Sequence, residues 1–312
     1  MSAIFSRVSK DLRFPVLNVT STEFESEPLG SKEKFWYSEK GKNFLFKRSR
    51  EGTGEHWAEK AACELALLLK LPHAVYNLAF WRRFPGVVTP NFSAARTLAH
   101  GNEFLARLPE YEKVKYKKYK QPLYTLSRVL AVLDRAGSNA LFRSSVKALS
   151  ALEIFTGYLL FDAWISNQDR HHENWGFLFS RGSDESLITF LAPTFDHAAS
   201  LGSIESDKSK FERLRTKSPE RGVEAFVKKA RSAFHREREG GRMSTLEAFE
   251  TIARKAPQGS VYWMNRLEDV TDKEIEGIFA RFDENIISDI SIEFAMEMLR
   301  INKERILGCD IT

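Results

Sequence analysis

One short polar run lies between two apolar segments and contains the residue types that could do chemistry. Residues 169–174 read Asp-Arg-His-His-Glu-Asn, after the apolar segment 151–165 and before the apolar pair Phe177-Leu178. Polar side chains buried between such elements must be hydrogen-bonded, metal-bound or catalytic. The run is therefore the first candidate for a functional site.

The spacing within this run indicates phosphoryl transfer. Asp169 and Asn174 stand five positions apart, which is the Asp-x-x-x-x-Asn spacing of a phosphotransfer loop. In such loops the Asp accepts the proton of the acceptor hydroxyl and the Asn binds Mg²⁺. Asp196 follows 22 positions after Asn174, behind an apolar strand and a turn. Since Mg²⁺ prefers oxygen ligands, Asn174 and Asp196 are predicted to hold it.

Phosphoryl transfer also requires a cation near the phosphates. Lys47 ends the strand-like segment 44–46, and the following segment has helical apolar spacing. Three glutamates of that segment could orient the lysine, and Glu59 is selected because it lies well inside the helix. Upstream, Gly30 is expected to let the backbone approach a phosphate.

The order of these features resembles the HipA-like kinases, toxin kinases of bacterial toxin–antitoxin systems. The resemblance extends from about residue 28 to residue 307. It rests on five segments, at residues 29–34 (Leu-Gly-Ser-Lys-Glu-Lys), 44–47 (Phe-Leu-Phe-Lys), 55–59 (Glu-His-Trp-Ala-Glu), 167–174 (Asn-Gln-Asp-Arg-His-His-Glu-Asn) and 192–196 (Ala-Pro-Thr-Phe-Asp).

The resemblance implies ATP and Mg²⁺ as cofactors and gives each candidate residue a role. It implies Asp169 as catalytic base and His171 as brace of the catalytic loop. At the ATP phosphates it places Lys47 with its helix partner Glu59, and Gly30 and Ser31 in the phosphate loop. It further implies Asn91 in the hinge strand 89–92 under adenine, and Asn174 and Asp196 as metal ligands. It also implies a protein substrate, possibly a translation component, and an antitoxin partner chain.

The elements around these residues predict an α+β, two-lobed protein-kinase-like fold. Segments 35–37 and 43–47 read as a hairpin, Gly54 opens a helix, and 75–80 and 86–89 read as strands. From about residue 94 the chain is expected to be mostly helical, with helices over 123–133, 151–165 and 299–307. We predict a nucleotide-binding lobe over residues 1–92 and a helical catalytic lobe over residues 93–312.

Simpler interpretations exist for each residue taken alone. Asp169 and Asn174 could cap a loop, Asp196 could close a turn, and Lys47 and Glu59 could face solvent. His171 and His172 with His197 could bind zinc, but adjacent histidines point in different directions. The sequence contains neither a Gly-x-Ser-x-Gly elbow nor a Gly-x-x-x-x-Gly-Lys-[Ser/Thr] loop, which argues against an α/β-hydrolase and a P-loop NTPase.

Two charge-dense segments, 111–120 and 205–241, are predicted to be solvated loops or helix faces. The basic, tyrosine-interleaved segment 111–120 could instead contact nucleic acid, an acidic protein or a tRNA-linked target. It is not amphipathic at helical period, which argues against a lipid kinase. A small-molecule kinase and a catalytically inactive nucleotide-binding partner protein remain alternatives, although the complete set of candidate residues argues against the inactive protein.

Composition limits the remaining classes. The 312 residues carry a net charge of +5, which permits a phosphate-bearing partner without requiring direct binding of nucleic acid. The two cysteines, Cys63 and Cys309, cannot form a disulfide framework, so a reducing compartment is expected. No apolar run is long enough to span a membrane, and we expect a cytoplasmic protein.

Overall fold

The structure is a computed structural model and describes most of the chain. The described residues are 7–21, 25–26, 33–93, 96–108, 111, 121–137, 143–146, 148–237 and 240–311. Within them, no helix is both long enough and apolar enough to cross a membrane.

A six-stranded sheet forms the N-terminal part of the fold. Its strands are β1 (Val16–Val19), β2 (Glu25–Ser26), β3 (Lys34–Glu39), β4 (Lys42–Arg48), β5 (Asn77–Trp81) and β6 (Phe84–Pro90), in the order β1-β5-β6-β4-β3-β2. The β3–β4 hairpin closes through Lys40 and Gly41, which both have positive φ, at 50° and 73°. Two positive φ values are typical of the turn that suits the twist of a hairpin. This hairpin and both later strands confirm the predicted elements.

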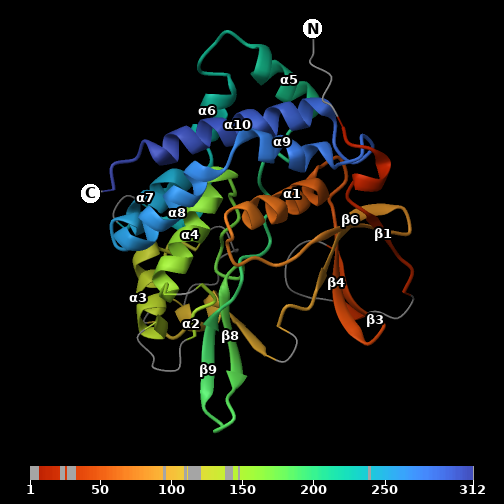
Figure 1. Cartoon of the computed structure of the whole chain (residues 1–312). Helices are drawn as coiled ribbons and strands as arrows, with labels where there is room; N and C mark the ends of the chain where they lie inside the picture. The colour runs from red at the N-terminus through yellow and green to blue at the C-terminus, as the bar shows by residue number, and fades with distance from the viewer. Residues whose placement is uncertain are drawn as a thin grey trace.

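Helix α1 (Glu55–Leu68) covers this sheet and contacts β5, β6 and α9 (Asp272–Ala280). Most of its residues are buried, including the charged Glu59. Figure 1 shows α1 between the sheet and the long helix α10 (Asp289–Leu307). Because α1 is enclosed from both sides, any polar group that it directs inward must find its partner within the protein.

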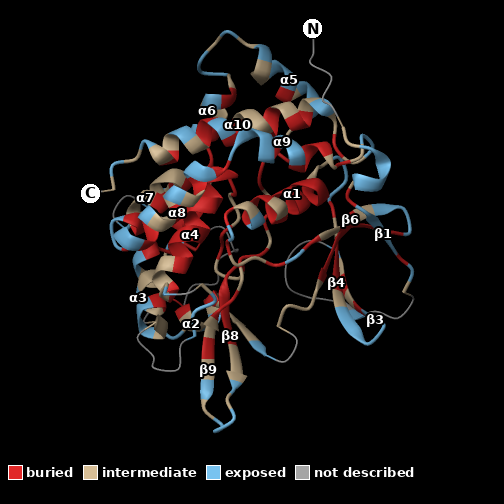
Figure 2. Cartoon of the chain, viewed as in Figure 1, coloured by how far each residue is buried: buried red, intermediate tan, exposed pale blue. Residues whose placement is uncertain are grey.

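Helix α4 (Ala151–Trp164) is the centre of the remaining structure. Ser150 and Glu153 form a capping box at its start, with Ser150 Oγ accepting from the Glu153 amide at 3.2 Å. Twelve of its fourteen residues are buried, because other helices pack around it. Figure 2 shows α4 mainly in the red of buried residues. The helices that contact α4 are α3 (Leu126–Gly137), α7 (Thr245–Ala253), α8 (Pro257–Asp269) and α10.

The remaining elements lie at the outside of this helical body. Helices α5 (Asp207–Arg215) and α6 (Val223–Lys228) pack on the outer side of α10 (Figure 1). A short 3₁₀ helix (Lys10–Leu12) precedes β1, and α2 (Gly101–Leu105) follows β7.

Two small sheets complete the part of the chain that was expected to be mostly helical. One contains β7 (Thr97–His100), β8 (Gly176–Arg181) and β9 (Leu187–Leu191), and the other contains β10 (Arg231–His235) and β11 (Arg242–Ser244). The hairpin of β8 and β9 projects from the body in Figure 1. An apolar strand before Asp196 was predicted and corresponds to β9, but its sheet was not, because β7 pairs with β8 from a segment distant in sequence. Strands β10 and β11 lie in a charge-dense segment without strand-like alternation.

The prediction that both charge-dense segments are solvated is wrong at several described positions, two of which carry polar side chains with distant partners. Tyr111 is buried, and its hydroxyl lies 2.7 Å from His172 Nδ1. Lys210 is buried as well and donates from Nζ to Ser291 Oγ at 2.6 Å. Residues 112–120 and Glu239 lie outside the described part of the chain. At both positions the buried side chain contacts a polar partner far away in sequence, which local charge density does not reveal.

The packing of α4 on α8 allows a test. A Cβ atom at Gly157 would lie 2.5 Å from the Trp263 ring, too close for a van der Waals contact. We therefore expect Gly157→Ala to lower the free energy of unfolding by about 1–3 kcal/mol. Gly277→Ala in α9 is the matched control, because nothing lies within 4 Å of its Cβ position. This control should raise the same quantity by up to about 1 kcal/mol. Urea unfolding measures both, and equal effects would contradict the packing.

Candidate active site

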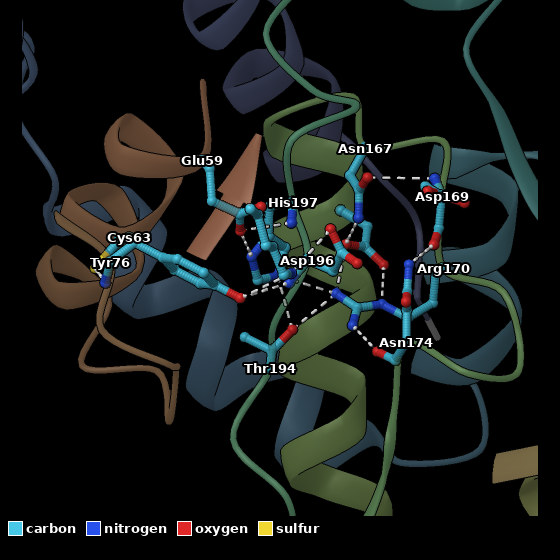
Figure 3. A network of polar contacts seen from close by, with 12 residues as sticks. Glu59, Cys63, Tyr76, Asn167, Asp169, Arg170, Asn174, Thr194, Asp196 and His197 are labelled. Carbon is cyan, nitrogen blue, oxygen red and sulfur yellow. Dashed lines mark hydrogen bonds and ion pairs between the residues drawn. The ribbon is translucent and has the colours of Figure 1, made fainter. Parts of the chain in front are cut away.

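The candidate catalytic loop begins where α4 ends. Ser166 leaves the helix with φ of 52°, and Asn167 then binds back to the last turn. The Asn167 amide nitrogens donate to Asp162, from the backbone to its carbonyl oxygen and from Nδ2 to Oδ1, both at 2.8 Å. Asn167 Oδ1 in turn accepts from the backbone amide of Asp169 at 3.2 Å. Asp169 is thus positioned by a short chain of hydrogen bonds that starts inside α4 (Figure 3).

Arg170 is a fully buried cation at the centre of the site. Its Nε and Nη2 bind the two carboxylate oxygens of Asp162 at 2.7 and 2.8 Å. Its other donors reach the Asn174 carbonyl oxygen at 2.7 Å and Thr194 Oγ1 at 2.8 Å. Burial alone lowers the pKa of Arg170, but the Asp162 carboxylate outweighs it and the pKa is raised. This guanidinium ties α4 to the loop 167–174 and to the segment that follows β9.

His171 and Asn174 shape the second half of the loop. His171 accepts from the Glu173 amide at Nδ1, at 3.1 Å, and its Nε2 lies 3.5 Å from Asp169 Oδ1. Asn174 donates from Nδ2 to the Asp169 carbonyl oxygen at 2.6 Å. The Asn174 amide oxygen is thus the end of this side chain that can bind another group. His171 contacts the residues that the sequence predicted it to brace.

Asp196 lies beside Lys47. Asp196 has φ of 63°, a left-handed conformation that Asp and Asn tolerate better than most residues. Its Oδ1 lies 3.3 Å from Lys47 Nζ. Burial is the largest single effect and lowers the pKa of Lys47, but Asp196, Tyr76 and Glu59 together raise it above its ordinary value. Lys47 is therefore a buried, charged ammonium at neutral pH.

Tyr76 is a site residue that sequence reasoning missed. Its hydroxyl oxygen accepts from Lys47 Nζ at 3.3 Å and from the Asp196 backbone amide at 3.4 Å. Its own backbone amide donates to Cys63 Sγ at 3.4 Å, and burial raises the pKa of Cys63 to about 11. The thiol therefore stays protonated. No sequence signal marks Tyr76, which reads as one more aromatic residue before β5.

The expected ion pair between Glu59 and Lys47 is absent, and both residues lie in the described part of the chain. Glu59 Oε1 instead accepts from the His197 backbone amide at 2.8 Å and lies 3.6 Å from His197 Nδ1. The physical reason is that the Asp196 carboxylate lies closer to the Lys47 ammonium, while the Glu59 carboxylate accepts from the backbone amide of His197. Glu59 still raises the pKa of Lys47 through space, after Asp196.

A cavity of about 150 Å³ opens beside Lys47 and Asp196. Thr89, Pro90, Asn91 and Phe92 line it, as do His171 and Asn174. The structure thus brings the predicted lysine, hinge segment and metal ligands to one cavity. Asp169 does not line it, and Gly30 and Ser31 lie outside the described residues.

The donors at this cavity fit magnesium. Asn174 and Asp196 provide an amide and a carboxylate oxygen, and Mg²⁺ usually binds one or two such side chains together with water and phosphate oxygens. No cluster of three or more His, Cys, Asp or Glu side chains is arranged for a metal ion in the described part of the chain. The three histidines of the zinc alternative lie in separate networks, since His172 contacts Tyr111 and His197 contacts Thr194.

Comparison with known proteins gives similarity in structure but none in sequence. No protein-family model matches the chain, and no curated protein matches its sequence. The crystal structure of the Helicobacter pylori proinflammatory kinase CtkA superimposes with a TM-score of 0.69 at 18% identity, covering 94% of this chain and 96% of CtkA. The chain has a kinase-like fold. This confirms the predicted fold class.

A second solved structure agrees with this fold. HipA of the Shewanella oneidensis MR-1 toxin–antitoxin system, in complex with HipB and operator DNA, matches with a TM-score of 0.54 and 10% identity. The match covers 98% of this chain and 74% of that one. At such identities the likeness concerns the fold, and the roles of individual residues depend on the geometry described above.

The position of Tyr76 generates a prediction. Tyr76→Phe removes the hydroxyl that accepts from Lys47 Nζ and from the Asp196 backbone amide, and leaves both donors short of one partner. We expect the free energy of unfolding to fall by about 1–2 kcal/mol. Tyr262→Phe is the matched control, because its hydroxyl makes no hydrogen bond within the described residues. Urea unfolding distinguishes the two, and a loss no larger than that of the control would contradict the role of Tyr76.

Proposed function

We propose that the chain is a HipA-like serine/threonine protein kinase that transfers the γ-phosphoryl group of ATP to a protein hydroxyl. The observation that carries this proposal is the convergence of Lys47, Asn174 and Asp196 on one cavity, with Asp169 joined to it through His171. A charged lysine and two oxygen ligands match the requirements of phosphates and their metal. The kinase-like fold supports the same assignment.

Each residue then has a chemical task. Lys47 neutralises phosphate charge, and Tyr76 keeps its ammonium beside Asp196. Asp169 orients the acceptor hydroxyl and receives its proton as the new P–O bond forms. Mg²⁺, when held by Asn174 and Asp196, would supply positive charge against the phosphate oxygens. Catalysis of this kind depends on positioning and electrostatics, because little covalent chemistry is asked of the protein.

The adenine end of the nucleotide is assigned to the segment 89–92. The Asn91 amide donates to the Asn43 carbonyl oxygen at 2.9 Å, which continues the pairing of β6 with β4 beyond Pro90. Phe92 and Leu98 add apolar surface to the same cavity, as an adenine ring requires. The cavity of about 150 Å³ is smaller than common nucleotide sites, so we propose that ATP binding widens it.

The biological role has two candidates. HipA belongs to a toxin–antitoxin system and was solved with HipB, which supports a toxin kinase with an antitoxin partner. A translation component as substrate is proposed from the resemblance in sequence alone. CtkA, which matches over nearly its whole length, carries the description proinflammatory kinase. That similarity favours, as second candidate, a kinase that acts outside a toxin–antitoxin system. The two candidates share their chemistry and differ in the substrate.

The first prediction of this proposal concerns Asp169. Asp169→Asn should lower phosphoryl transfer by about 10²–10⁴-fold while the fold persists, because the amide cannot accept the hydroxyl proton. Transfer of label from [γ-³²P]ATP to proteins of a bacterial lysate measures it. Asp134→Asn, an exposed aspartate of α3, is the matched control and should be fully active. Chelation with EDTA should abolish transfer by the unmodified chain. Full activity of Asp169→Asn would contradict the assignment.

The second prediction separates the two biological candidates. If the chain is a toxin kinase, its induction in a bacterial host should arrest growth, and Lys47→Ala, Asp169→Ala and Asp196→Ala should each remove the arrest at matched expression. The physical reason is that the phosphates, the hydroxyl and the metal must be held together. Arrest by Asp169→Ala as strong as by the unmodified chain would show that toxicity is independent of transfer. Active enzyme without arrest would favour the second candidate.

A further inference from the structure

A second cavity, of about 190 Å³, lies on the other side of Asp169. It is lined by Asp169 and Gln168 of the catalytic loop, by Ser203 of the segment after Asp196, and by two arginines, Arg50 and Arg242. It shares no lining residue with the cavity that contains Lys47. Arg50 and Arg242 are far apart along the chain, so no local sequence pattern connects them.

Asp169 stands between the two cavities. Its Oδ1 lies 3.5 Å from Nε2 of His171, and His171 lines the first cavity. In phosphoryl transfer the attacking and the leaving oxygens lie roughly in line on opposite sides of phosphorus. Asp169 lines the second cavity and not the first, so an acceptor hydroxyl held in the second cavity would lie beside Asp169 while ATP phosphates lie at Lys47.

The second cavity is lined by two arginines and two carboxylates, Glu55 and Asp169, and the two arginines differ in their partners. Arg50 Nη1 lies 3.1 Å from Glu55 Oε1, so this cation has a buried carboxylate beside it. Arg242, on β11, is partly buried, and its guanidinium makes no hydrogen bond or ion pair with any residue that the structure describes. Across the same small sheet, Arg231 donates from Nη1 to the Lys228 carbonyl oxygen and has no described carboxylate partner. A partly buried cation without a counter-charge favours an anionic ligand.

We propose that the second cavity receives a polypeptide segment in which the acceptor Ser or Thr is close to an acidic side chain, whose carboxylate binds Arg242. This inference rests on the proposed kinase function. The cavity is smaller than sites for drug-sized ligands and suits single side chains of an extended segment. The acceptor oxygen forms the new P–O bond, ADP leaves with the electron pair of the broken bond, and Asp169 takes the hydroxyl proton.

The test uses synthetic peptides with one central Ser and a single position fixed as Glu, Gln or Lys, with mixed residues elsewhere. Phosphorylation by the unmodified chain should be about tenfold higher with Glu than with Gln at one flanking position, and lowest with Lys, since one charge-assisted contact is gained or lost. Arg242→Glu should reverse the order of Glu and Lys. Arg83→Glu makes the same change of charge in an exposed turn that lines neither cavity, and should keep the original preference.

A second measurement uses whole proteins, in case the chain phosphorylates folded proteins but not short peptides. Phosphosites produced in a lysate, mapped by mass spectrometry, should be enriched in Asp and Glu near the modified residue with the unmodified chain and lose that enrichment with Arg242→Glu. This inference would be overturned if transfer depended on Asp169 but showed no preference for acidic residues. It would also be overturned if Arg242→Glu left the preference unchanged. Either result would leave the proposed kinase function intact. Absence of Asp169-dependent transfer in both assays would overturn both.

Discussion

The buried guanidinium of Arg170 is the constraint on which the site depends. A cation that is fully removed from water must be paired, and Arg170 finds its counter-charge in Asp162 of α4. Its remaining donors fix the carbonyl oxygen of Asn174 and the hydroxyl of Thr194. One side chain thus sets the distance between the loop that carries Asp169 and the segment that carries Asp196 (Figure 3).

From this centre the site extends across the sheet. Lys47 reaches Asp196 from β4, and Tyr76 bridges the ammonium and the backbone of Asp196 from the segment before β5. Glu59 binds the same segment at the residue after Asp196, by accepting from the backbone amide of His197. The strands and the helical body therefore meet at residues 194–197, and the lining of the first cavity includes groups from both.

The parts of the site that follow local rules could be predicted from sequence. The hairpin before Lys47, the helix after Gly54 and the loop spacing from Asp169 to Asn174 depend on neighbouring residues, so periodicity and turn residues were sufficient. Arg170, Tyr76 and the partner of Glu59 could not be found this way, because their contacts join residues far apart in sequence or look like ordinary loop and core residues. The boundary between lobes at residue 92 stays a prediction.

We infer that the Arg170–Asp162 pair positions the candidate catalytic loop rather than merely stabilising it. Asp162→Leu alone leaves a buried, unpaired cation and should lower the free energy of unfolding by about 3–5 kcal/mol. Combining it with Arg170→Met removes that charge and should recover most of the loss. The decisive measurement is phosphoryl transfer by this double variant at a temperature where urea unfolding shows it folded. We predict that transfer stays at least tenfold below that of the unmodified chain, and transfer at the original rate would contradict the claim.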